Sequence, residues 1–288
     1  MQRALHLMVN KQAAVRHSVR KFQQNPTAGM LLSNSEALTE VCHDLKTPIQ
    51  TIRGALQLLS MSINNGQSST RSARYINMLD GSSQHLLRMV SNLVDQLRLE
   101  TGALSSYPIC LDLAAHLRLL TDLSQSYAEF AGVTLSAEEL DSERLVMMDV
   151  DKLDKILLNL LSNALKYVPQ GGHVCLRLSC GKRRLTLSVQ DDGHGIAPER
   201  MANLFRSPAD LEPDGLGGAR MGLLLSQELS ELLGGQLSVQ NLPKGGFCAQ
   251  LTLPYLPAEN QSSDSAPSES DLTARLRTEL SAVFLRSK

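Results

Sequence analysis

Residues 149–167 read DVDKLDKILLNLLSNALKY, and their pattern is the strongest indication of how the second half of the chain folds. Its apolar residues return at helical spacing on one face, which predicts an amphipathic helix packed on a core. An adjacent stripe carries Lys152, Asn159, Asn163 and Lys166. Amide side chains one turn apart beside lysines suit an oxygen-liganded Mg²⁺ and phosphate oxygens. A solvated helix surface is the alternative interpretation of Asn163.

Strand and helix patterns surround this helix over residues 107–257. Alternating or continuous apolar runs predict strands, and longer periodic segments predict further helices. The expected strands cover 144–148, 173–179, 184–190, 236–240 and 247–254, and the expected flanking helices cover 113–130 and 221–233. Helices and strands in this order predict a two-layer α/β sandwich with a mixed sheet.

The preceding segment, residues 35–104, shows only helical periodicity. Apolar residues follow a spacing of three and four along 38–59 and again along 76–97, with a turn at 64–69 between them. The apolar seam of such a hairpin is too wide for one helix pair to cover, so a four-helix bundle in a homodimer is expected. The fold class is therefore α+β, with a helical-hairpin dimerisation domain followed by an α/β sandwich.

The first helix of the hairpin contains His43 within VCHDLKTP, residues 41–48. A lone histidine on a helix is usually a polar surface residue, but its neighbours favour chemistry. Asp44 is placed to accept a hydrogen bond from the imidazole or to take up its proton. Thr47 lies one turn further on, with a hydroxyl that would orient a water on the same face. Pro48 removes a backbone hydrogen bond and should bend the helix where local geometry matters.

Two glycine-rich segments follow in the α/β region. VQDDGHGI, residues 189–196, ends a strand, and the glycines after Asp191 let the backbone approach a ligand closely. DGLGGARMGL, residues 214–223, precedes a helix, which is a place where phosphate meets backbone N–H groups. Both segments are weak signals alone, because similar turns are common.

In this order, the motifs resemble those of the sensor histidine kinases of two-component systems. Residues 43–48 resemble the H-box of the HisKA type. The helix ending at 167 and the turn at 189–196 resemble the N-box and G1 box of the GHKL ATP-binding domains. The resemblance implies a phosphoacceptor and dimerisation domain at 35–104 and a catalytic ATP-binding domain at 107–257.

The resemblance also implies a role for each matching residue. In the hairpin, His43 is phosphorylated, Asp44 acts as base and Thr47 supports dephosphorylation of the partner. In the ATP-binding domain the pattern assigns Asn163 to Mg²⁺ with Asn159 assisting, Lys166 to a phosphate, Tyr167 to the nucleotide pocket, Asp191 to the adenine amino group, and Gly193, Gly195, Gly218, Arg220 and Gly222 to the nucleotide-binding turns. ATP and Mg²⁺ are the implied cofactors, and the receiver domain of a response regulator is the implied partner.

The glycine-rich loop departs from the family's GxGLGL pattern. It reads GARMGL at 218–223, so Arg220 stands where the second glycine is expected. A left-handed backbone there would be strained by arginine, which would weaken ATP binding. Strain would favour a degenerate transmitter that binds a partner or acts as a phosphatase through Thr47. Alternatively, the guanidinium binds phosphate and the chain is an active kinase. A GHKL ATPase of the chaperone or DNA-repair kind would leave the His43 helix unexplained.

Composition and charge limit the classes of protein and the locations that fit this chain. A net charge of −1 gives no global field that would attract nucleic acid, and five cysteines without a CxxC pair fit a reducing cytosol. No run approaches the ~18–20 apolar residues of a membrane span. The basic segment 1–34 predicts a helix near an anionic membrane surface or a connector, with a transit peptide as a weaker alternative. Residues 258–288 form a Ser/Pro-rich linker and a short amphipathic helix. We expect a cytoplasmic location, with membrane contact only through the basic segment or through residues upstream of this chain.

Overall fold

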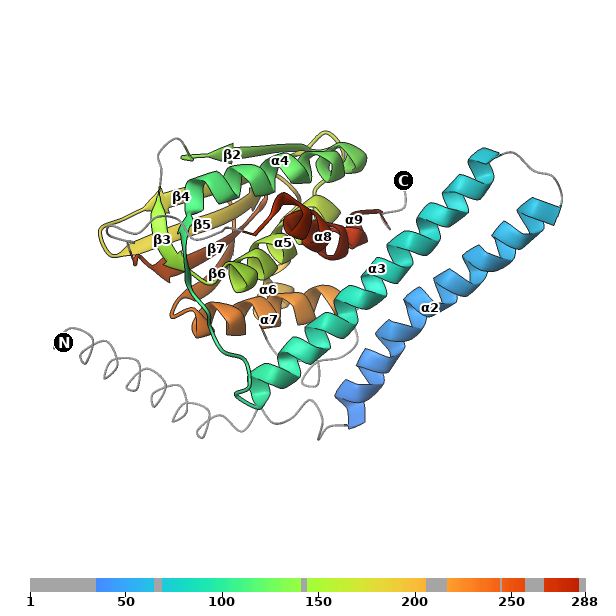
Figure 1. The fold of residues 1–288 in the computed structure, drawn as a ribbon, viewed down its shortest axis with the longest axis horizontal. Helices are drawn as coiled ribbons and strands as arrows, with labels where there is room; N and C mark the ends of the chain where they lie inside the picture. Colours follow the sequence, from blue (N-terminus) through green and yellow to red (C-terminus); the bar gives the residue numbers. More distant parts are fainter. Residues whose placement is uncertain are drawn as a thin grey trace.

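A computed structural model describes residues 35–64, 69–140, 144–205, 217–243, 245–256 and 267–284. Two long helices, α2 (Ser35–Asn64) and α3 (Ser69–Glu100), run antiparallel beside an α/β layer (Figure 1). The helical-hairpin part of the predicted fold is confirmed. The basic segment expected to be helical at 1–34 lies outside the described residues. None of the helices within the described ranges is long and apolar enough to span a membrane.

The hairpin leaves much of its apolar surface exposed. Pro48 and Ala55 are buried along α2, and α2 continues as a helix across Pro48. Large apolar side chains remain exposed on both helices, namely Ile49, Leu56, Leu58, Met61, Ile63, Ile76, Met78, Leu87, Val90 and Val94. An exposed stripe of this size is what a two-helix seam leaves for a second hairpin to cover.

The α/β layer contains a five-stranded mixed sheet in the order β2-β4-β5-β7-β6. Strand β2 pairs parallel with β4, and the other neighbours are antiparallel. The strands are β2 (Thr134–Glu138), β4 (His173–Cys180), β5 (Arg184–Asp191), β6 (Gln236–Asn241) and β7 (Phe247–Pro254). A separate two-stranded sheet joins β1 (Ile109–Asp112) to β3 (Leu145–Met148). The predicted mixed sheet is confirmed, with β1 and β2 as additional strands.

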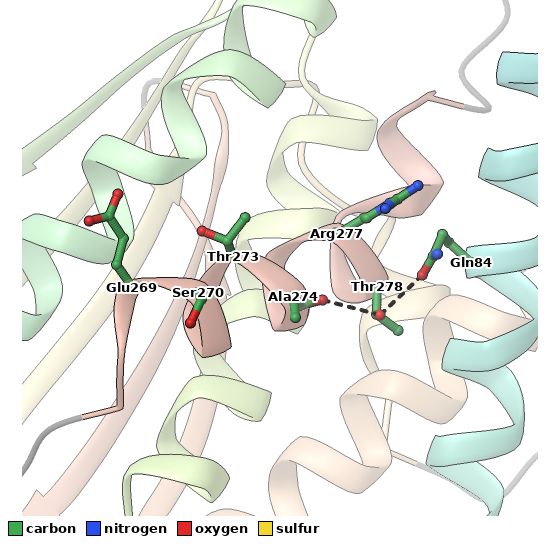
Figure 2. Close-up of a pocket in the computed structure, with 7 residues that line it drawn as sticks. All are labelled: Gln84, Glu269, Ser270, Thr273, Ala274, Arg277 and Thr278. Carbon is green, nitrogen blue, oxygen red and sulfur yellow. Dashed lines mark hydrogen bonds between the residues drawn. The ribbon is translucent and has the colours of Figure 1, made fainter.

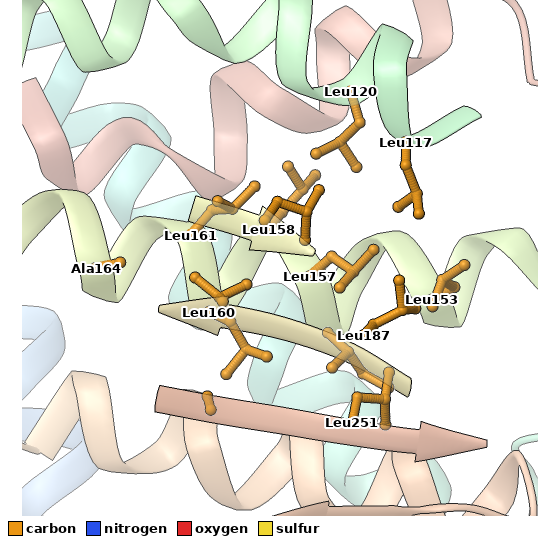
Figure 3. Close-up of a cluster of buried hydrophobic side chains, with 14 of the residues drawn as sticks. Leu117, Leu120, Leu153, Leu157, Leu158, Leu160, Leu161, Ala164, Leu187 and Leu251 are labelled. Atoms are coloured by element: carbon orange, nitrogen blue, oxygen red, sulfur yellow. The ribbon is translucent and has the colours of Figure 1, made fainter. Parts of the chain in front are cut away.

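Helices α4 (Leu113–Ala131), α5 (Val150–Tyr167) and α7 (Gly217–Leu232) pack against the five-stranded sheet, and a short α6 (Pro198–Met201) follows β5 (Figure 1). The leucines of α5 form the centre of the core. Leu157 and Leu161 are fully buried among side chains of α4 and of the sheet, including Leu187 and Leu251 (Figure 3). Burying such a side chain stabilises the fold by about 1.5–3 kcal/mol relative to leaving it exposed.

The ends of α5 have separate physical causes. Asp149 caps the N-terminus, where its carboxylate accepts from the Lys152 N–H at 3.2 Å and pairs with the Lys152 ammonium at 2.7 Å. At the other end Val168 is extended, which is what a following Pro169 favours. Lys152 is therefore committed to the helix start, whereas Asn159 and Asn163 lie further along.

The last helices, α8 (Glu269–Glu279) and α9 (Ser281–Phe284), lie between α3 and the α/β layer (Figure 1). Leu272, Leu276, Leu280 and Val283 are fully buried. The short C-terminal helix expected from the sequence is therefore present, and it is part of the core.

Candidate active site

The amide of Asn159 is buried and fully engaged. Its Oδ1 accepts from Arg88 Nη2 of α3 at 2.7 Å, and its Nδ2 donates to Ser226 Oγ of α7 at 2.8 Å. Ser226 in turn donates to the Gly222 carbonyl at 2.9 Å. A Cβ at Gly222 would lie 2.4 Å from Asn159 Oδ1, so a glycine is needed for α7 to approach the amide. In this arrangement Asn159 joins three helices.

Asn163, one turn further along α5, differs from Asn159. Its Nδ2 is buried and has no hydrogen-bond partner among the described residues. A buried amide without a partner costs free energy, which a ligand or a water would offset. The unpartnered atom is an N–H donor, which suits a phosphate oxygen, whereas the amide oxygen of the same side chain is a ligand type that Mg²⁺ accepts, so the residue present fits a metal–phosphate group.

Lys166 and Tyr167 lie together at the exposed end of α5. The Lys166 ammonium lies 5.0 Å from the centroid of the Tyr167 ring, within the range of a cation–π contact, and both residues are exposed. The Lys166 charge also acts on His85 of α3. Burial, with Arg88 and then Lys166, lowers the pKa of His85 to about 4, so that imidazole is neutral at ordinary pH.

Asp191 stands at the end of β5, next to the end of α5. Its Oδ1 accepts from the Gly193 N–H at 2.9 Å, and a Cβ at Gly193 would lie only 3.7 Å from the Tyr167 carbonyl oxygen. Burial raises the pKa of Asp191, backbone N–H groups of Gly193 and Phe247 oppose the rise, and Asp192 adds to it. The turn therefore places a half-buried carboxyl beside the polar end of the N-box helix.

Glycines make this turn geometrically feasible. Gly246 has φ +101°, and a Cβ there would lie 2.0 Å from the Asp191 carbonyl oxygen. Gly195 has φ +69°, and its Cβ would lie 2.7 Å from Asn241 Oδ1. The Asn241 amide holds the turn by accepting from the Ile196 N–H at 2.8 Å and donating to the Ile196 carbonyl at 2.7 Å.

Helix α7 begins at Gly217, inside the glycine-rich segment 214–223, where the sequence predicts a phosphate-binding helix start. Gly218 and Arg220 belong to the first turn of α7, and the side chain of Arg220 lies outside the described residues. Arginine adopts a right-handed helical backbone without strain. The strained-backbone interpretation of Arg220 is therefore wrong, because it required a left-handed residue.

The phosphoacceptor motif lies in α2. The backbone of His43 and Asp44 is helical, and their side chains lie outside the described residues. Thr47 is exposed, and its carbonyl accepts from Thr51 Oγ1 at 3.1 Å. The predicted helical setting of the motif is therefore present, whereas the roles of these residues stay predictions.

Two residues of the site, Asn241 and Arg88, were not predicted from the sequence. Asn241 has a weak local signal, an asparagine directly after the last expected residue of a strand. Arg88 lies on the face of α3 opposite the predicted apolar stripe, among polar residues, and it is nevertheless buried. A cation on a polar helix face gives no local signal, and its partner Asn159 lies 71 residues away.

Comparisons with known proteins agree with this architecture. Residues 33–102 match the profile of the His Kinase A (phospho-acceptor) domain, HisKA. Residues 148–257 match HATPase_c, the histidine kinase-, DNA gyrase B-, and HSP90-like ATPase profile. Among curated proteins, the sensor histidine kinase TmoS of Ectopseudomonas mendocina is 29% identical over 77% of this chain and 23% of its own length. The sensor histidine kinase WalK of Bacillus subtilis is 25% identical over 80% of this chain and 38% of its own length.

Solved structures share the fold. Full-length ShkA in complex with AMPPNP has a TM-score of 0.55 at 24% identity, covering 75% of this chain and 46% of that one. Histidine kinase ThkA in complex with the response regulator protein TrrA has a TM-score of 0.58 at 16% identity, covering 86% of this chain and 68% of that one. This chain spans less than two fifths of the length of TmoS and WalK. With a HisKA hairpin followed by an HATPase_c layer, the chain belongs to the sensor histidine kinases.

Proposed function

We propose that this chain binds Mg-ATP in its α/β layer and transfers the γ-phosphoryl group to His43. The observation that carries the proposal is that α5 ends against the Asp191 turn, one helical turn after Asn163. Asn163 has a buried amide nitrogen without a partner among the described residues, and Asp191 is tethered at the adjacent turn. ShkA, a relative in fold, was solved with the ATP analogue AMPPNP, which supports nucleotide binding here.

Each group has a definite task in this proposal. The Asp191 carboxylate accepts a hydrogen bond from the adenine amino group, and Tyr167 covers the base from the end of α5. Lys166 contacts a phosphate, while Asn163 would ligate Mg²⁺ with the Asn159 amide oxygen assisting. The metal would supply positive charge that offsets the negative charge of the phosphates.

The chemical step forms an N–P bond and breaks an O–P bond. The neutral imidazole of His43 attacks the γ-phosphorus in line, ADP leaves, and Asp44 takes up the proton that the imidazole releases. Little covalent chemistry falls to the protein, so positioning and charge stabilisation supply most of the acceleration. Thr47, which is exposed on α2, would orient a water for dephosphorylation of the partner.

The phosphoryl group then passes from His43 to an aspartate of a response-regulator receiver domain. The ThkA structure in complex with TrrA supports a partner of this kind. The exposed apolar stripe of α2 and α3 supports a homodimer with a four-helix core. Within the chain, Arg220 at the start of α7 is proposed to contact a phosphate with its guanidinium.

Incubation with γ-labelled ATP and Mg²⁺ tests the proposal. Wild type should acquire label that is acid-labile and base-stable, as phosphohistidine is. His43→Ala should lose the label but keep nucleotide binding, and Asn163→Ala should lose both. Asp122→Asn, at an exposed position of α4, is the matched control and should behave as wild type. Labelling that survives His43→Ala would reject the assignment.

A further inference from the structure

The C-terminal helices α8 and α9 lie beyond residue 257, where the HATPase_c match ends. They nevertheless pack against the rest of the molecule. Their apolar side chains pack into the core, and their polar side chains contact both α3 and α5. In this position α8 and α9 connect α3 of the hairpin to α5 of the α/β layer.

Glu279 is the centre of this junction. One carboxylate oxygen, Oε2, lies 2.9 Å from Arg88 Nε of α3 as a charge contact without hydrogen-bond geometry, and Oε1 lies 3.0 Å from Lys155 Nζ of α5. Lys155 also pairs with Asp95 of α3 at 3.3 Å. The carboxylate is almost completely buried, so removing its charge would leave Arg88 poorly compensated.

Arg88 links Glu279 to Asn159, a residue of the proposed nucleotide site. With Glu279 on its Nε, the guanidinium donates through Nη1 to Ser162 Oγ at 3.0 Å and through Nη2 to Asn159 Oδ1 at 2.7 Å. A guanidinium and a metal ion are both cations that would use the same amide oxygen. The arrangement that holds α3 on α5 therefore opposes cation binding at Asn159.

The outer contacts of α8 are polar. Arg277 pairs with Asp80 of α3 at 2.8 Å. Thr278 Oγ1 donates to Gln84 Oε1 at 3.2 Å (Figure 2). A pocket of about 740 Å³ lies along this seam, lined by Gln84, Glu269, Ser270, Thr273, Ala274, Arg277 and Thr278 (Figure 2). The outer face of α8 thus meets α3 through ionic and polar contacts, while its apolar face is buried in the core.

The buried face of α3 also carries polar atoms whose hydrogen bonds are not satisfied. His85 Nδ1, Asn92 Oδ1 and Gln96 Oε1 are buried without hydrogen-bond partners among the described residues. Each such atom costs about 1–3 kcal/mol in the docked arrangement. These costs favour an interface that opens and closes over one that is permanently formed.

We propose that the C-terminal helix is an intramolecular clamp that, through Glu279, holds Arg88 on Asn159 and so opposes Mg-ATP binding. The inference rests on the proposed nucleotide site. Because coupling between two binding events is reciprocal, Mg-ATP bound at the site loosens α8, and loosening α8 raises the affinity for Mg-ATP. The clamp thereby joins the hairpin and the catalytic layer into one regulated unit.

Affinity and hydrogen exchange of the full chain test the clamp. Glu279→Gln and Arg88→Met should bind a fluorescent ATP analogue with Mg²⁺ about tenfold more tightly than wild type, a typical coupling factor. In the nucleotide-free protein, Glu279→Gln should also speed amide exchange across residues 269–279. Thr273→Ala, at an exposed position of the same helix, is the matched control and should change neither reading.

A charge exchange tests the contact itself. Arg277→Glu should loosen α8 and tighten nucleotide binding a few-fold, and adding Asp80→Arg should restore both values. Nucleotide affinity that is unchanged or weaker in Glu279→Gln and Arg88→Met would overturn the clamp, because a merely structural role predicts weaker binding. Unchanged exchange of α8 in Glu279→Gln would overturn it independently of nucleotide. Failure of every variant and of wild type to bind Mg-ATP would instead overturn the proposed function.

Discussion

Glu228 of α7 should make the stability of this protein depend on pH close to neutrality. Its Oε2 accepts from Gln96 Nε2 of α3 at 2.9 Å, so the carboxyl lies in the interface between hairpin and catalytic layer. Burial raises its pKa from 4.5 to about 7, the Gln96 hydrogen bond opposes the rise, and Glu100 and Glu231 add to it. The substitution Glu228→Gln keeps the size and removes the titration.

The sign and size follow from the shift. The folded state holds the Glu228 proton up to about pH 7, whereas the unfolded chain releases it near pH 4.5. The contribution to stability is therefore fully present below pH 4.5 and is lost as pH rises from there through about 7. A shift of this size corresponds to about 3 kcal/mol, as an order of magnitude.

Urea unfolding between pH 4.5 and pH 8 measures the effect in wild type and in Glu228→Gln. The free energy of unfolding of wild type, relative to that of the variant, should fall by about 3 kcal/mol across this range. Taking the difference between the two proteins removes the contribution of His85 and other groups. A difference that stays constant with pH would refute the argument that burial holds the proton.

Three further predictions address the site and the core. Gly246→Ala should abolish nucleotide binding in a fluorescence titration, because its Cβ would lie 2.0 Å from the Asp191 carbonyl oxygen on a backbone at φ +101°. Leu157→Ala should lower the free energy of unfolding in urea by about 2–5 kcal/mol, because it opens a cavity in a fully buried layer. His85 has a pKa lowered to about 4, so the stability it contributes is present above pH 6.5 and lost as pH falls through 4; His85→Gln should flatten this acid limb in thermal melts.

Most of the fold could be predicted from local patterns of the sequence. The leucine spacing of 153–161 predicted α5 because one helix face meets the core, and the seam of 38–59 predicted α2 for the same reason. Strand β2 has only a short alternation of apolar and polar residues, which is too weak a signal to predict a strand by itself. Its pairing depends on β4, whose first residue aligns with Thr134 from 39 residues away. A short parallel strand is fixed by its neighbour, so the sequence around it contains little of the information.

The candidate site likewise has residues that could be predicted from the sequence and residues that could not. Asp191 and its glycines were identifiable, because a turn that brings backbone close to a ligand requires small residues in sequence. The clamp through Arg88 and Glu279 was not identifiable, since it unites three helices far apart along the chain. The backbone conformation at Arg220 could not be read from one sequence, and the helical turn of α7 excludes the left-handed alternative. The phosphate-binding role of Arg220 stays a prediction.

The two amides of the N-box helix therefore need different experimental treatment. Replacing Asn159 would strand the Arg88 guanidinium and the Ser226 hydroxyl, so lost activity would mix damage to the interface with damage to the site. Replacing Asn163 strands no such partner among the described residues, because its amide nitrogen has none to lose. A change in Mg-ATP affinity at Asn163 with unchanged stability thus reports on the ligand alone. The same comparison at Asn159 reports the ligand and the coupling of the hairpin to the α/β layer together.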